Sequence, residues 1–149
     1  MKKLQGKWNY QSFCSFAAVA DRSAAPPTPP RVARQALVAG PWAPLSVMEF
    51  ETDADGKVTG SAQNGPLVFN IVGSVTPAME GIPERGASPL PEGIELVVTV
   101  PATGTEYKLR GFFLAGSNHI VGTVVALSND LGLQPAGTSG PFVLHPATS

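Results

Sequence analysis

The chain has 149 residues, enough for one domain that buries a sizeable core without a metal or a disulfide. Its 10 basic and 11 acidic side chains leave a formal net charge of −1, which excludes the long-range attraction that draws basic proteins to nucleic acids and anionic membranes. Charged residues make up only 14% of the chain and hydrophobic residues 43%. A typical globular domain has about 25% charged residues, so we expect another subunit to cover part of the outer surface.

The number of cysteines and the hydropathy of the chain indicate in which cellular compartment the protein resides. The only cysteine is Cys14, so no disulfide can form within the chain and a reducing compartment is favoured. No apolar stretch reaches the length of a membrane span. The two lysines at positions 2 and 3 and the apolar run 13–20 loosely resemble a signal peptide, but cleavage there would remove a good first strand. We therefore expect a cytoplasmic rather than a secreted protein.

The first predicted strand covers residues 6–14, with Trp8 and Tyr10 on one face and polar residues on the other. The segment 17–44 follows, and its many prolines resist both helix formation and strand pairing. A loop of this length in a compact domain is more often functional than accidental, and we interpret it as a lid.

From residue 45 onward, short strands alternate with turn signals. Strands are predicted over residues 45–52, 57–62, 67–75, 94–100, 106–114, 119–127 and about 140–145. The short turns between them, at residues 53–56, 64–66, 102–104 and 116–118, all contain glycine. Residues 76–92 form a second, longer loop that is rich in proline and glycine. The sequence thus predicts one all-β domain over residues 1–149: an eight-stranded antiparallel up-and-down β-barrel with a long Pro-rich first loop. Eight strands close around a single small ligand.

The start of this meander carries a Gly-x-Trp pattern in Gly6-Lys7-Trp8, and Gly56-Lys57-Val58-Thr59-Gly60-Ser61 is a Gly-rich strand after a tight turn. In these features the chain resembles the calycins, the superfamily that contains lipocalins, fatty-acid-binding proteins and avidins. The resemblance spans nearly the whole chain. It implies a ligand cavity open at one end of the barrel and an apolar plug at the other, where Trp8 would sit.

The residues expected to line the ligand site are mostly aromatic. A tyrosine hydroxyl can orient a carbonyl or hydroxyl group of a ligand within an apolar wall. An amide that interrupts an apolar strand, as Asn70 does, needs a hydrogen-bond partner such as a ligand. The predicted ligand-binding residues are Tyr10, Trp42, Phe69, Asn70, Tyr107 and Phe113.

No common catalytic motif is present. A cyclase or isomerase that folds an apolar substrate and moves one proton would leave little trace in a sequence, because it needs mainly shape and exclusion of water. The candidate catalytic residues for such an enzyme are Tyr10, Glu49 and Tyr107. For Glu49, alternation with Met48 and Phe50 favours the interpretation that its carboxylate faces water.

The same strands also bear on whether the protein binds a metal ion and whether it forms an oligomer. Two histidines, His119 and His145, do not make a metal site without a nearby carboxylate, so we expect neither a metal nor another cofactor. Val97-Val98 and Val124-Val125 make their strands apolar on both faces, which predicts a homo-oligomer or, alternatively, a collapsed loop over these strands. The leading hypothesis is a barrel that binds a small, largely apolar molecule. The alternatives are the cyclase or isomerase and a structural domain with a filled core.

Overall fold

The computed structural model describes residues 2–18, 36–128 and 135–147, with the side chains of 15–18, 36–41 and 43–45 excepted. The described residues form eight antiparallel strands and one short 3-10 helix. These elements are β1 (Gly6–Ala18), β2 (Ala36–Thr52), β3 (Lys57–Asn64), β4 (Leu67–Thr76), η1 (Pro83–Arg85), β5 (Gly93–Val100), β6 (Thr105–Phe113), β7 (Ile120–Ala126) and β8 (Ser139–Pro146). Among the described helices none is long and apolar enough to cross a membrane.

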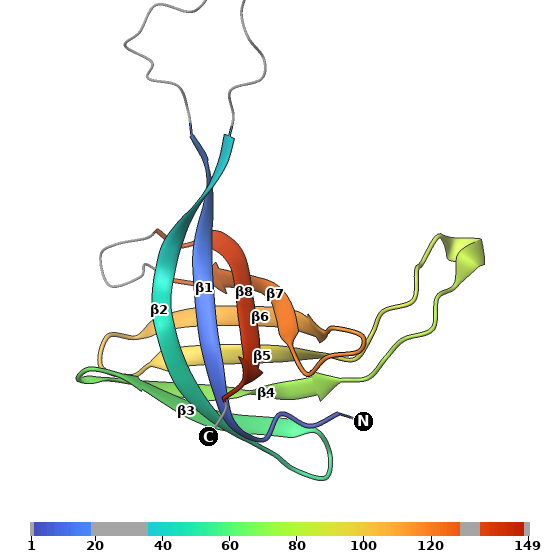
Figure 1. Ribbon diagram of the computed structural model, residues 1–149, viewed down its shortest axis with the longest axis horizontal. Helices are drawn as coiled ribbons and strands as arrows, with labels where there is room; N and C mark the ends of the chain where they lie inside the picture. Colours follow the sequence, from blue (N-terminus) through green and yellow to red (C-terminus); the bar gives the residue numbers. More distant parts are fainter. Residues whose placement is uncertain (1, 19–35, 129–134, 148–149) are drawn as a thin grey trace, which may run out of the picture.

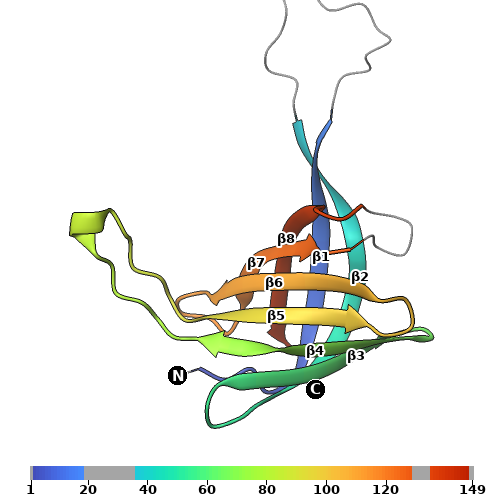
Figure 2. The same cartoon turned by 180° about the vertical axis from the view of Figure 1, so that it is seen from behind.

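The sheet closes on itself. Each strand pairs with the next one in sequence, and β8 pairs with β1 through contacts from Trp8↔Pro146 to Ser12↔Phe142. Figures 1 and 2 show the resulting barrel from two sides. The predicted fold, an all-β eight-stranded up-and-down barrel, is confirmed.

The short turns have the backbone conformation that their residues favour. Gly56, Gly65, Gly104 and Gly116 have φ values of 84°, 59°, 71° and 75°, in the region that side chains other than glycine rarely adopt. In the first of these turns an Asp53 carboxylate oxygen accepts hydrogen bonds from two backbone N–H groups. Local chemistry therefore sets the ends of most strands.

Strand β2 begins earlier than predicted, at Ala36, and this shortens the predicted lid. β1 and β2 stay paired as far as Ala18↔Ala36, although β8 stops pairing with β1 at Ser12. The two strands thus continue beyond the barrel as a two-stranded ribbon (Figures 1 and 2). The rest of the predicted lid, residues 19–35, lies outside the described residues.

Two irregularities explain how prolines fit into β2. Between Tyr10 and Phe13 the register with β2 shifts twice, and each shift places one extra residue in β2. Such bulges leave residues outside the hydrogen-bond ladder, which is where a strand tolerates proline. Pro44 lies between the paired residues Ala43 and Ser46, and Pro41 pairs with Phe13 in the part of β2 that β3 does not reach. The proline content that predicted a loop is therefore compatible with an irregular strand.

The inner faces of the strands form one hydrophobic cluster. In β4, for example, Ile71 and Val75 are buried, while Val68 and Val72 on the other face are 49% and 52% exposed. The buried members of the cluster are Leu4, Trp8, Tyr10, Met48, Phe50, Val58, Ala62, Ile71, Val75, Ile94, Leu96, Val98, Leu109, Phe113, Ile120, Val124, Phe142 and Leu144.

Residues 2–5 cover one end of the barrel, which we call the capped end. Leu4 is fully buried, and its backbone is held by Thr52, whose hydroxyl donates to the Leu4 carbonyl (2.6 Å) and accepts from the Leu4 N–H (3.1 Å). The Trp8 indole N–H donates to the carbonyl of Gln5 (2.9 Å). Because these polar groups find partners, the chain can cover the apolar end of the barrel at low cost.

Candidate functional site

The opposite end of the barrel, which we call the aromatic end, is lined by aromatic side chains that are only partly buried. Trp42 on β2, Phe69 on β4 and Tyr107 on β6 pack against the hydrophobic cluster but remain half-buried. At the capped end, Phe50 and Phe113 are 1% and 6% exposed. Inward-facing aromatic surface is therefore accessible at the aromatic end.

Trp42 and Tyr107 meet across the interior. Their ring centroids lie 6.0 Å apart at an interplanar angle of 72°, an edge-to-face contact. Since β2 and β6 are on opposite sides of the closed order β1 to β8, the rings approach through the barrel and not along its wall. An edge-to-face pair stabilises by about 0.5–1.5 kcal/mol beyond the area that the rings bury.

Small side chains stand next to two of these rings. Ala62 on β3 is the cross-strand partner of Phe69, and Ala126 on β7 is the partner of Tyr107. Both alanines are buried. Sequence reasoning missed them, although counting inward positions from the predicted turns would have found both. Each of these rings thus has a small side chain at its cross-strand position.

Tyr10 lies deeper in the barrel, on β1. It is 6% exposed, and its ring centroid is 5.9 Å from that of Phe142. Burial raises the pKa of its phenol to about 12, and a hydrogen bond with Ser12 opposes this rise to a smaller extent. The phenol therefore keeps its proton at neutral pH, where it can donate a hydrogen bond but does not serve as a base.

This shift predicts a pH dependence of stability. The unfolded chain releases the Tyr10 proton near pH 10, whereas the folded protein holds it until about pH 12. Between these values the unfolded state binds fewer protons, so the free energy of unfolding should fall as the pH rises, by up to about 1.4 kcal/mol per pH unit. Urea unfolding at a series of alkaline pH values measures this slope.

The matched variants for this experiment are Tyr10→Phe and Tyr107→Phe. Tyr10→Phe should remove the part of the alkaline slope that comes from this phenol, whereas Tyr107→Phe should retain it, because that variant leaves the Tyr10 phenol in place. Equal slopes in the wild type and in Tyr10→Phe would contradict the assignment.

The other predicted site residues do not join the aromatic end. Phe113 lies at the capped end, 5.1 Å from the ammonium nitrogen of Lys2. Asn70 is exposed on the outer face of β4, between the inward-facing Phe69 and Ile71, so the expectation of an inward amide is corrected. Neighbouring residues of a strand point to opposite faces, which places Asn70 outside once Phe69 is inside.

Glu49 is also on the outer face. It is exposed, while Met48 and Phe50 on either side are buried, as alternation along the strand favoured. Its carboxylate is therefore separated by the barrel wall from a molecule held inside.

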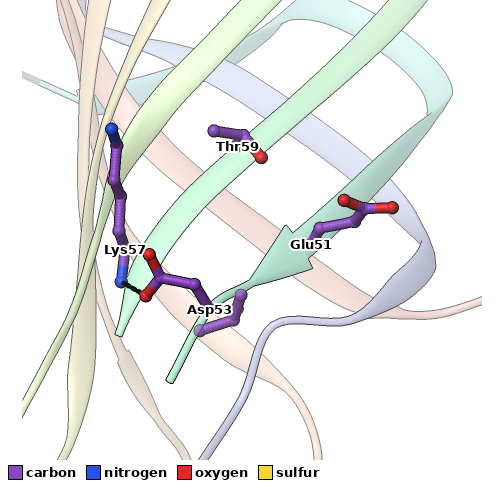
Figure 3. A pocket seen from close by; sticks show the side chains of 5 residues that line it. Glu51, Asp53, Lys57 and Thr59 are labelled. Carbon is purple, nitrogen blue, oxygen red and sulfur yellow. Dashed lines mark hydrogen bonds between the residues drawn. The ribbon is translucent and has the colours of Figure 1, made fainter. Parts of the chain in front are cut away.

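A surface pocket of about 260 Å³ lies at the capped end, lined by Glu51, Thr52, Asp53, Lys57 and Thr59. Figure 3 shows that its charged groups do not converge, because the charged ends of Glu51 and Lys57 point away from one another. The Asp53 carboxylate accepts a hydrogen bond from the Lys57 backbone N–H (2.9 Å), which stabilises the turn between β2 and β3. The pocket is thus a consequence of the turn.

The two histidines meet edge to face at the capped end. Their ring centroids are 5.5 Å apart, and the Nδ1 atom of His145 lies 3.4 Å from the carbonyl oxygen of Pro146. Across residues 2–18, 36–128 and 135–147, no group of three or more His, Cys, Asp or Glu side chains is arranged to hold a metal ion.

Comparison with known proteins gives no family for this chain. The sequence matches no family model, and a search of curated proteins finds no similar sequence. The chemistry of the barrel itself must therefore indicate the function.

Proposed function

We propose that the protein binds a small, largely apolar molecule at the aromatic end of the barrel, in contact with Trp42, Phe69 and Tyr107. The observation that carries this proposal is the contrast between the two ends. At the capped end the interior is sealed by Leu4 and Trp8, whereas at the aromatic end three inward-facing aromatic side chains stay half-buried. Partly exposed aromatic surface within a concave wall is typical of small-molecule sites.

The polar groups inside the barrel limit the chemistry of the ligand. The buried polar residues of the described chain are Ser12, Thr52 and Thr105, and none of the residues buried there carries a charge. A charged group buried without a partner costs several kcal/mol, so the part of the ligand inside the barrel should be uncharged. The Tyr10 phenol, protonated at neutral pH, hydrogen-bonds with Ser12, so it would serve a carbonyl or ether oxygen of the ligand in exchange for, or in addition to, that contact.

We also infer a relationship to calycin-type barrels. Three features support it: a Gly-x-Trp sequence opening β1, the closed meander of eight strands, and the indole of Trp8 at the capped end, bonded to the carbonyl of Gln5. In that superfamily the ligand enters at the end opposite the plug, which here is the aromatic end.

The cyclase or isomerase hypothesis has less support than binding. Of its three candidate residues, Glu49 faces outward, and the Tyr10 phenol is protonated at neutral pH, so it is not available there as a general base. Tyr107 remains, half-buried at the aromatic end. The inward positions of Tyr10 and Tyr107 are explained if their hydroxyl groups only form hydrogen bonds, and no chemical step is needed to account for them.

Titration with the uncharged fluorescent dye Nile red tests the proposal. We expect saturable binding at one site per chain. Phe69→Ala removes a ring from the site and should weaken binding about tenfold, equivalent to about 1.4 kcal/mol. Val68→Ala is the matched control, because Val68 is the preceding residue on the same strand and faces outward.

Binding that is lost in Phe69→Ala and kept in Val68→Ala supports a site inside the barrel. The proposal is overturned if Nile red shows no saturable binding, or if the two variants bind it equally well.

A further inference from the structure

The connection between β4 and β5 is an ordered arm that projects from the barrel. We define the arm as residues 77–91. Its two sides are joined by backbone hydrogen bonds between Met79 and Leu90 (2.8 and 2.9 Å) and between Ile82 and Ala87 (2.9 and 3.1 Å). A Cβ atom on Gly81 would lie 2.8 Å from the Ala87 carbonyl oxygen, which shows how closely the two sides approach. The arm is thus a built hairpin and not an irregular loop.

The apolar side chains of the arm have little cover within one chain. Met79, Ile82 and Leu90 are 60%, 46% and 37% exposed, and the other residues of the arm are also exposed, except for Gly81, which is half-buried. Figures 1 and 2 both show the arm extending away from the barrel. Three large apolar side chains on a projecting hairpin are typical of a segment that is buried in an assembly.

The outer wall of the barrel carries an apolar strip, in which Val72 is 52% exposed and Val97 and Val125 are half-buried. Register places Val72 on β4, Val97 on β5, Lys108 on β6 and Val125 on β7 side by side, and we call these four residues the valine row. Polar residues border the row on both sides, except for Leu127 at one corner, which is 48% exposed. They are Asn70, Thr99 and Glu106 toward the aromatic end, and Ser74, Glu95, Arg110 and Thr123 toward the capped end.

The arm and the valine row match in size and charge. Four adjacent strands span about 14 Å, and the three-residue step from Met79 to Ile82 covers about 10 Å in an extended chain. Glu80 and Glu84 outnumber Arg85 on the arm, so the arm is acidic, whereas the one charged residue of the row is Lys108. Arg110 beside the row lies 3.5 Å from Glu95 on the same barrel.

We propose that the arm of one chain packs on the valine row of a second copy of the same chain, and reciprocally, to form a symmetric dimer. Within the closed barrel each strand is paired on both sides, so its faces and projections are the surfaces that it offers to a second copy. Both complementary surfaces belong to one chain, and a twofold arrangement buries both arms and both rows at once. The low content of charged residues, 14%, agrees with a covered surface.

Sedimentation velocity on the full chain, from about 1 to about 100 μM, tests the proposal. The wild type should sediment as a dimer. Replacing Met79, Ile82 and Leu90 together with serine should raise the dimer dissociation constant about 30-fold or more, and Val72→Ser should also raise it. Val47→Ser is the matched control, since Val47 is 48% exposed on β2, outside both surfaces, and this variant should stay dimeric.

Exchanging the charges of the arm and the valine row tests whether these two surfaces contact each other. Lys108→Glu should weaken the dimer, and combining it with Glu80→Lys and Glu84→Lys should restore it. The proposal is overturned if the wild type is monomeric throughout this range, if the arm variant dimerises like the wild type, or if Val72→Ser and Val47→Ser behave alike. Nile red binding at the aromatic end is measured separately, so the two proposals can fail independently.

Discussion

Truncation of Phe142 to alanine is expected to lower the free energy of unfolding by about 3–5 kcal/mol. The side chain on β8 is fully buried, and it lies against Gly111 on β6, where an added Cβ would be 2.8 Å from the ring's Cζ atom. Because Gly111 has no side chain to move into the space, the cavity left by the ring cannot be refilled from that side. The cost should therefore be large for a Phe→Ala change.

Urea unfolding followed by circular dichroism measures the loss. Phe112→Ala is the matched control, since Phe112 is half-buried and adjacent to Phe113 on the opposite face of β6, and its truncation should cost much less. Single domains have about 5–15 kcal/mol of stability in total, so Phe142→Ala could unfold the barrel outright. Phe142→Leu then provides an intermediate point. Similar losses for Phe142→Ala and Phe112→Ala would contradict this account of the core.

Much of the fold was predictable because its signals are local. Gly56 and Gly65 follow Asp55 and Asn64, and both adopt the positive φ that tight hairpins require. In β6, the exposed Glu106, Lys108 and Arg110 alternate with residues that face inward. Turns and alternation of this kind depend on a few neighbouring residues, so one sequence is enough to locate the strands.

Features that depend on distant contacts were not predictable in this way. The capped end rests on hydrogen bonds between Leu4 and Thr52, which are 48 positions apart. The first part of β2 contains Pro41 and Pro44, and only pairing with β1 through two bulges keeps it in the sheet. The proline content of such a segment argues for a loop until its partner strand is known.

The candidate site was partly predictable for the same reason. Tyr10 and Tyr107 belong to strands whose alternation is clear, and both point inward. Asn70 was misplaced because residues 67–75 are largely apolar on both faces, so hydropathy does not show which set faces the interior. The three-dimensional contact between Trp42 and Tyr107 across the barrel could not be read from either strand alone.

Replacement of Gly122 by alanine should have the opposite effect from most Gly→Ala changes in strands. Where the backbone tolerates it, that change stabilises a protein by about 0.4–1 kcal/mol through the unfolded state. Here the added Cβ would lie 2.0 Å from the Arg110 carbonyl oxygen and 2.4 Å from the Gly111 Cα, both backbone atoms of β6. Backbone atoms cannot rotate away, so β6 and β7 would have to separate.

We therefore expect Gly122→Ala to destabilise the barrel by at least the roughly 1–3 kcal/mol of an overpacked core, and Gly122→Val to prevent folding. Thr123→Ser is the control on the same strand, because Thr123 is exposed and keeps its hydroxyl in this variant. Chemical unfolding of the three variants measures the effect. Gly111 on β6 and Gly122 on β7 are cross-strand partners. Because neither residue has a side chain, the two strands can approach each other closely at this point. A Gly122→Ala protein as stable as the wild type would show that β6 and β7 separate easily, and closure of the barrel would not depend on this pair of glycines.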